Sequence, residues 1–375
     1  MRSRTALLLA GLAALPAGAE YRVTIEPSVE ATAVHDDNLN SADEDPLRDT
    51  IQRLSPALAL RVDGSRLSAR ATYGADSETY AQHSQFDDSL ARQQAALGIT
   101  YDMSSRLTLS LEGSWVATNT LTDLNADTGI AGSRMPARRI SGGPAAQFRV
   151  SPLTTAIASA STTRTAADNG DSIDASSQSL FVERRRSSRD VFTAGYEHSV
   201  YTFDGLARHH IDTHAVIGRW QRALGARTSF SLNAGPRLTS GASPSVDLSA
   251  SIDHAWTSAS VSAAVARNQA TLIGYTGLVD TESVQVRFGW TASRRLTAFA
   301  APAVFRSSHE SLRGIVYRFS GGARYSITPL LDVQVSWNSD RQDGAIDPLR
   351  AGLSLSRSVL SLGFSTRWNR EVISR

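Results

Sequence analysis

The chain has 375 residues, a hydrophobic content of 41% and a formal net charge of +2. A charge this close to zero gives no general signal for nucleic-acid binding, so no nucleic-acid partner is expected. The sequence contains no cysteine, which argues against a small secreted module held together by disulfides. Length alone leaves the number of domains open, because closed barrels run long as single units.

The N-terminus has the pattern of a secretory signal peptide. Two arginines precede an apolar run over residues 6–15, and Ala17-Gly18-Ala19 offers a small-residue cleavage site. The apolar run is about half the roughly 20 residues that a membrane-spanning helix needs. We therefore expect a Sec-type signal peptide over residues 1–19 and a single domain over residues 20–375.

From Tyr21 onward, apolar and polar side chains alternate as they do in strands. In residues 101–115, Leu107, Leu109 and Leu111 alternate with polar residues, which is typical of a strand with one apolar face. The same pattern recurs, in chain order, over residues 53–62, 67–73, 229–234, 246–253, 284–290 and 315–320. Residues 153–165, 208–222 and 259–267 alternate poorly, so the sequence does not predict which of their side chains face outward.

Short and long links alternate between these segments. Short links occur at residues 63–65, 103–105, 151–152, 185–190, 223–225, 257–258, 293–295 and 328–329, and longer polar links cover residues 36–50, 82–89, 118–137, 166–176, 239–245, 269–281 and 338–350. Outer-membrane barrels show this alternation, with short turns on the periplasmic side and longer loops outside. We predict an all-β fold, a transmembrane antiparallel up-and-down β-barrel of about 18 strands, within a range of roughly 16–20.

Aromatic residues near the predicted strand ends favour a lipid-facing apolar side. A soluble sandwich packs its apolar faces inward, whereas membrane barrels carry aromatic girdles at the interfaces. The predicted girdle consists of Tyr101, Trp115, Trp220, Trp256, Trp290, Tyr325 and Trp368, most of them at the periplasmic boundary. Such a barrel must close, because each unpaired backbone polar group in hydrocarbon costs several kcal/mol.

Charged residues of both signs fall on the predicted inward face. The set is Glu26, Glu30, Arg53, Arg61, Arg70, Arg92, Glu112, Arg149, Glu197, Arg237, Asp247, Asp253, Arg287, Arg318 and Arg324. A barrel of roughly 16 to 18 strands is wide enough to hold water. These residues therefore either line a hydrated lumen or pair across strands and stiffen the wall. In either case the mixture of charges predicts weak ion preference.

Acidic residues gather in the long links. They are Asp36, Asp37, Asp43, Glu44, Asp45, Asp49, Asp123, Asp127, Asp168, Asp171, Asp174, Asp340, Asp343 and Asp347. Such carboxylates could hold Ca²⁺ or Mg²⁺ that bridges to lipopolysaccharide phosphates. The sequence shows no spaced calcium-loop pattern of the EF-hand type, which favours plain solvation. No metal site is predicted.

Catalytic motifs are scarce. His209, His210 and His214 lie near Asp204 and Asp212, but the sequence has no G-x-S-x-G elbow, H-E-x-x-H motif or P-loop. We predict a protein that is not an enzyme, with no catalytic residues and no cofactor.

Three stretches near the N-terminus resemble a known family. EPSVEATAVHDDNLN (residues 26–40), RLSPALAL (53–60) and ATYGADSETYAQHSQFDD (71–88) are similar to outer-membrane β-barrel proteins found beside exopolysaccharide biosynthesis loci, including those of PEP-CTERM sorting systems. The resemblance is best over residues 21–120. It implies a porin-like barrel in the Gram-negative cell envelope, a role in polysaccharide secretion across the outer membrane, and no established catalytic residues.

Two functions fit these patterns. The first is a channel or conduit for polysaccharide or small solutes, and the second is a non-conducting structural or interaction barrel whose acidic loops contact surface polysaccharide or lipopolysaccharide. The expected partners are outer-membrane lipid, lipopolysaccharide, the barrel-assembly machinery, and exopolysaccharide or its periplasmic export components. Barrels commonly end in an aromatic residue that the assembly machinery reads, whereas here NREVISR (369–375) follows Trp368. Either Trp368 serves as that signal or assembly is less orthodox.

Overall fold

The computed structural model describes residues 21–120, 124–125, 127–132, 134–204, 208–309, 312–345, 353–368 and 370–374. The predicted signal peptide lies outside these residues. Within them the strands are β1 (Tyr21–Asp36), β2 (Asp49–Gly64), β3 (Leu67–Tyr80), β4 (Asp88–Asp102), β5 (Leu107–Thr120), β6 (Arg134–Ser151), β7 (Thr154–Ala167), β8 (Ser172–Arg185), β9 (Asp190–Asp204), β10 (His209–Gly225), β11 (Thr228–Thr239), β12 (Ser245–Ala255), β13 (Ala259–Thr271), β14 (Leu278–Thr291), β15 (Leu296–His309), β16 (Leu312–Thr328), β17 (Leu331–Ala345), β18 (Leu353–Arg367) and β19 (Arg370–Ser374), with a 3₁₀ turn η2 (Ser84–Phe86) between β3 and β4.

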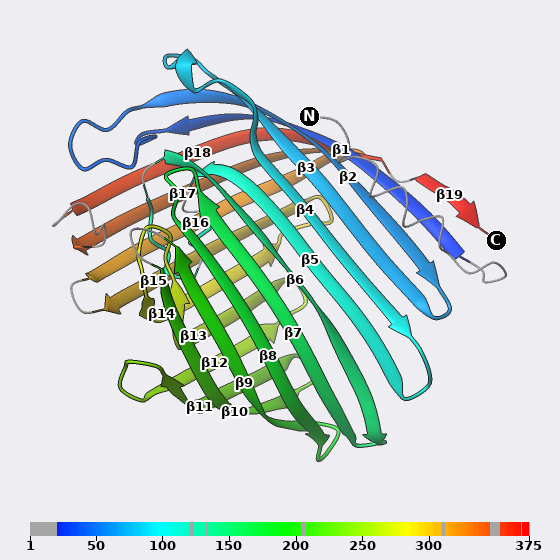
Figure 1. Ribbon diagram of the computed structural model, residues 1–375. Coiled ribbons are helices and arrows are strands. Elements are labelled where there is room, and N and C mark those ends of the chain that lie inside the picture. The colour runs from blue at the N-terminus through cyan, green and yellow to red at the C-terminus, as the bar shows by residue number, and fades with distance from the viewer. Residues whose placement is uncertain are drawn as a thin grey trace, which may run out of the picture.

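Each strand from β1 to β18 pairs antiparallel with the next, and β1 pairs with both β2 and β18. The sheet therefore closes into an 18-stranded barrel with long, oblique strands (Figure 1). β18 pairs with residues 28–36 of β1 and β19 pairs with residues 22–25, so β19 continues the edge of β18. The predicted fold class is confirmed, and the C-terminal segment that follows Trp368 is part of the barrel wall.

The register places apolar side chains on the outer face. Leu58 pairs with Tyr73, and Leu97 pairs with Ala71. Leu58, Tyr73 and Leu97 are all exposed, because the pleat directs them away from the interior. In the described residues, no helix is both long enough and apolar enough to cross a membrane.

Several predicted links are shorter in the structure, because strands continue into them as long as a neighbouring strand supplies backbone partners. The predicted link over residues 269–281 shrinks to residues 272–277, since β13 ends at Thr271 and β14 begins at Leu278. Paired strands also occupy the segments that alternate poorly, as β7, β10 and β13. The link between β9 and β10 has no counterpart among the predicted links.

Candidate functional site: the barrel interior

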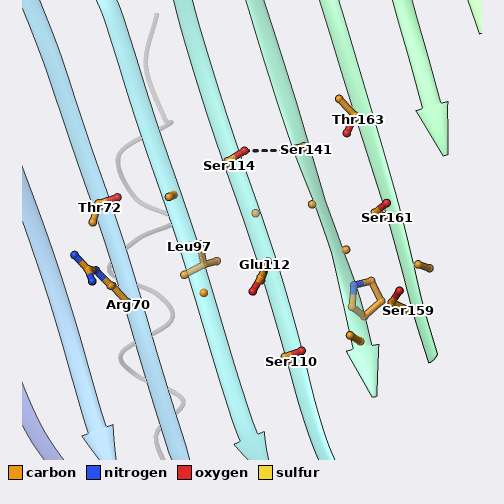
Figure 2. Close-up of a pocket in the computed structure, with 18 of the residues that line it drawn as sticks. Arg70, Thr72, Leu97, Ser110, Glu112, Ser114, Ser141, Ser159, Ser161 and Thr163 are labelled. Carbon is orange, nitrogen blue, oxygen red and sulfur yellow. Dashed lines mark hydrogen bonds between the residues drawn. The ribbon is translucent and has the colours of Figure 1, made fainter. Parts of the chain in front are cut away.

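One end of the barrel carries the short turns and the other carries the longer links, and we call these the short-turn end and the long-loop end. The inner wall of β3 to β7 lines an open cavity of 840 Å³. Hydroxyl and glycine residues supply most of its lining, and Arg70 and Glu112 are its charged residues (Figure 2). Ser114 and Ser141 are hydrogen-bonded across β5 and β6 at 2.7 Å. A surface of this kind offers many weak hydrogen-bonding groups and few anchoring ones.

Close approach between backbones shapes this wall at Gly142. A Cβ placed there would lie 2.7 Å from the carbonyl oxygen of Glu112, closer than side chains tolerate. Glycine at this position therefore allows the backbones of β6 and β5 to approach closely.

Toward the short-turn end, the other predicted lumen residues make single contacts with neighbouring side chains or lie opposite small residues. Arg149 lines a second cavity of 260 Å³ together with Arg66 and Asp102. The remaining contacts are Arg61 with Asp63 (Nε to Oδ2, 2.7 Å), Arg324 with Gln334 (3.2 Å), and Arg287, whose guanidinium lies 4.9 Å from the centre of the Phe299 ring. Glu26 lies opposite Ala59, and Asp253 lies between Ser229 and Ser262 in the ladder.

Toward the long-loop end, the predicted arginines form ion pairs. These pairs are Arg53 with Glu78 (2.7 Å), Arg318 with Asp340 (2.7 Å), and Arg237 with Asp247. Arg92 lies opposite Asp76 in the ladder, Glu30 accepts a hydrogen bond from Gln334 (2.5 Å), and Glu197 lies opposite Ala215. Among these predicted residues, ion pairs between neighbouring strands therefore lie toward the long-loop end.

The link between β5 and β6 crosses the interior. Arg139 on β6 donates to the carbonyl oxygen of Leu124 at 2.5 Å, and Arg318 on β16 donates to that of Gly129 at 3.0 Å. The backbone N–H of Ala131 donates to Gln342 on β17 at 3.0 Å. Since β6 and β16 lie almost opposite each other in the ring of strands, this segment, which the structure describes at residues 124–125 and 127–132, bridges the lumen. We call it the crossing loop.

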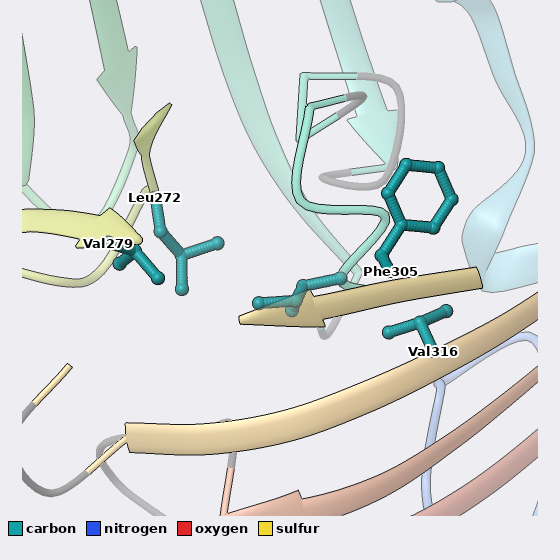
Figure 3. Packing of buried hydrophobic residues seen from close by; sticks show 5 residues of the cluster. Leu272, Val279, Phe305 and Val316 are labelled. Carbon is teal, nitrogen blue, oxygen red and sulfur yellow. The ribbon is translucent and has the colours of Figure 1, made fainter. Parts of the chain in front are cut away.

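An apolar cluster holds the crossing loop to the far wall. Ile130 packs with Val279, Phe305 and Val316 and with Leu272 from the link between β13 and β14 (Figure 3). Ile273 from the same link packs against the cluster around Leu124. Two links thus meet inside the barrel and narrow it toward the long-loop end.

The sequence prediction missed this narrowing. The sequence predicts residues 118–137 and 269–281 as polar links, although each contains several apolar residues. Leu124, Ile130, Leu272 and Ile273 were the available signal, because side chains of this type are seldom left in water when a loop can bury them.

Six of the seven predicted girdle aromatics lie toward the short-turn end. They are Tyr101, Trp220, Trp256, Trp290, Tyr325 and Trp368. Trp115 differs, because it is the ninth of 14 residues in β5 and lies nearer the long-loop end. The indole N–H of Trp220 donates to Asp190 at 3.1 Å. That bond lowers the pKa of the Asp190 carboxyl, which lies at the rim.

The histidines considered for catalysis lie apart from the interior cavities. His214 stacks on His198 with ring centres 4.7 Å apart and shares a hydrogen bond of 2.6 Å with the Tyr196 hydroxyl. Tyr196 is an exposed residue of the outer face, and His214 shares that face. The ring of His210 shares a hydrogen bond of 2.9 Å with the hydroxyl of Thr202. These contacts belong to aromatic and polar pairs between β9 and β10.

Several acidic residues of the long links have structural partners. Asp36 is 1% exposed and pairs with Arg357 at 2.5 Å, and Asp37 accepts from the backbone N–H of Ser358 at 2.6 Å. Asp49 accepts from His83 at 2.9 Å. Among the side chains that the structure describes, no three His, Asp or Glu residues gather as a metal site requires. Asp123 and Asp347 lie outside the described residues.

No protein-family model and no curated protein sequence matches the chain. Solved structures do. OccK2 (OpdF) of Pseudomonas aeruginosa matches 94% of this chain and 98% of its own at 11% identity, with a TM-score of 0.52. OccAB3 of Acinetobacter baumannii matches 92% and 99% at 9% identity and a TM-score of 0.51. OpdK of Pseudomonas aeruginosa, an outer-membrane protein solved with vanillate, matches 92% and 99% at 12% identity and a TM-score of 0.51. At these identities the similarity establishes the fold alone, a closed antiparallel β-barrel of 18 strands.

Proposed function

We propose that this barrel is a porin-like conduit of the Gram-negative outer membrane that serves exopolysaccharide export or surface-polymer assembly. The observation that carries the proposal is the contrast between its two faces. Outward leucines, valines and aromatics suit lipid, while the 840 Å³ interior cavity is lined by hydroxyls and glycines with Arg70 and Glu112. Hydrated solutes can pass such a wall because no single contact holds them strongly.

The link to exopolysaccharide rests on two features. One is the resemblance of residues 21–120 to barrels beside exopolysaccharide loci. The other is the density of interior serines and threonines, since sugar hydroxyls and side-chain hydroxyls can each donate and accept. The chemistry is one of passage, and the proposal includes no catalytic step.

Conductance tests the conduit. The refolded mature barrel is expected to give stable ion steps in a planar bilayer. The sharpest variant is Gly98→Trp, because Gly98 lines the cavity and a Cβ there meets nothing within 4 Å. The added indole narrows the lumen without disturbing the wall. Leu111→Trp is the matched control, since Leu111 is exposed on the outer face and is not among the residues that line the cavity.

We expect Gly98→Trp to lower the conductance at least twofold and to reduce surface polysaccharide when it replaces the natural gene, with Leu111→Trp close to wild type. Folding of each variant is checked by heat-modifiable gel migration. If both variants conduct and export equally, the interior is not the route.

A second function is favoured by the apolar packing of the crossing loop. Thr128 is fully buried and Ile130 nearly so, which suits a barrel closed by its own links that acts through surface contacts. A silent wild type that gains ion steps when residues 124–132 are replaced by a short Gly-Ser link would support this closed barrel. It would also contradict a constitutively open conduit.

A further inference from the structure

A row of charged residues lies on the outer face near the long-loop end of β13 to β17. Arg267, Glu282 and Arg306 are consecutive register partners on β13, β14 and β15. The row continues through Ile315 on β16 to Asp343 on β17. Arg341 lies two residues before Asp343, closer to the middle of β17, and its register partner is Tyr317. We call Arg267, Arg306 and Arg341 the arginine row.

An apolar row lies directly beneath it. Val265, Val284, Val304 and Tyr317 are partners across β13 to β16, two residues closer to the middle of each strand. Two residues of a strand rise about 6.6 Å. Arginine on the lipid face of a barrel is strongly destabilising at the midplane and is tolerated near an interface. On β13 and β15, the steps from Val265 to Arg267 and from Val304 to Arg306 therefore mark where hydrocarbon gives way to headgroups. Arg341 on β17 lies at the end of the apolar row, next to Tyr317.

The guanidinium groups remain open to a ligand at that boundary. Arg306 lies 3.6 Å from Glu282 and Arg341 lies 3.2 Å from Asp343, but each arginine side chain is 68% exposed. Exposed ion pairs of this kind are weak, so the guanidinium groups can still bind a second anionic ligand. The three arginines outnumber the two carboxylates.

We propose that the arginine row binds the phosphates of a lipid headgroup in the outer leaflet, of the phosphorylated glycolipid type found in lipopolysaccharide. The inference rests on the membrane placement proposed above and is independent of whether the lumen conducts. Arg267 and Arg306 are two strands apart, about 10 Å at the usual strand spacing. Guanidinium forks bind phosphate oxygens in pairs, while the valine row and Tyr317 contact the acyl chains below.

The test uses the full barrel in detergent and two preparations of lipid A, bisphosphorylated and phosphatase-treated. The readout is the midpoint of heat-modifiable unfolding on a gel as lipid is titrated. One variant carries Arg267→Gln, Arg306→Gln and Arg341→Gln. A charge-matched control carries Arg219→Gln, Arg287→Gln and Arg324→Gln, which remove three interior arginines. Arg306→Gln alone serves if the triple variant folds poorly.

We expect bisphosphorylated lipid A to raise the midpoint of the wild type and of the interior control, with the concentration for half effect at least tenfold higher in the arginine-row variant. The phosphatase-treated lipid should raise it much less. Equal responses to the two lipids, or equal loss in both triple variants, would overturn the proposal. So would an equal response to inorganic phosphate, which would identify the ligand as the free ion. A barrel that binds the lipid but gives no ion steps contradicts only the conduit.

Discussion

The ring of Phe305 lies directly against Gly129, where a Cβ would meet its Cδ2 atom at 2.6 Å. Gly129 also has φ of +67°, a conformation that costs a residue with a side chain about 1–3 kcal/mol. Gly129→Ala should therefore lift the crossing loop from the far wall. The expected result is faster proteolytic cleavage within residues 124–132 of the folded barrel and a larger conductance.

Gly170 supplies the control for this prediction. It also has a positive φ, +96°, but a Cβ there meets nothing within 4 Å. Gly170→Ala reproduces the backbone strain without the contact with Phe305, so protection of the crossing loop should remain at the wild-type level. If Gly129→Ala leaves cleavage and conductance unchanged, the contact does not hold the loop.

The contact between Asp49 and His83 predicts a dependence on acid pH. Asp49 begins β2, outside the stretch of about 9–11 residues that crosses a bilayer. Burial tends to raise the pKa of its carboxyl, but hydrogen bonds from the His83 ring and from the backbone of Thr50, Gln82 and His83 leave that pKa below its usual 3.8. Stability from a lowered pKa is fully present above 3.8 and is lost as pH falls through the folded value.

Asp49→Asn should accordingly lower the unfolding midpoint at pH 7, and the difference from wild type should persist to about pH 4 and shrink only below it. Heat-modifiable migration measured from pH 7 to pH 2.5 provides the check. A difference that already fades between pH 7 and pH 5 would assign the effect to a different group.

The two faces of β2 should respond in opposite ways to arginine. Leu58 is the tenth of 16 residues in this strand and is exposed on the outer face. Leu58→Arg should cost about 2–4 kcal/mol of folding stability in lipid if it lies near the midplane. Ala59→Arg places the same group inside, opposite Glu26, and should cost little. Urea titration of folding into vesicles measures both, and equal tolerance would contradict the assignment of faces.

The barrel could be predicted from the sequence because its main determinant is local. A side-chain period of two survives in strands such as β5 and β12, where apolar residues alternate with hydroxyl and acidic residues, and a sheet that faces lipid must close. The pattern weakens in β10, where Ile211 and Ile217 face inward and Val216 faces outward, so apolar residues on both faces hide the period.

For the interior, the sequence predicts which residues face inward but not which of them contact one another. Whether Arg53 and Arg318 form ion pairs while Arg70 lines a cavity depends on which acidic residue the register places opposite each one. The path of the crossing loop depends on Phe305 and Gln342, which come far later in the chain. Neither the ion-pair partners nor the contacts of the crossing loop produce a local sequence pattern. The apolar residues within the predicted polar links are the one local feature that indicates burial of these links.

The seam of the barrel should depend on the C-terminal strand. β19 pairs with residues 22–25 of β1, on the side where β18 covers only residues 28–36. Deleting residues 370–375 leaves that part of β1 without a neighbour on one side, and unpaired strand edges are costly in lipid. We expect a lower unfolding midpoint and slower folding into vesicles, although Trp368 is retained. Because the effect involves only backbone pairing, Glu371→Gln should behave as wild type. A deletion variant that folds as fast and melts as high would show that the functional wall ends at Trp368.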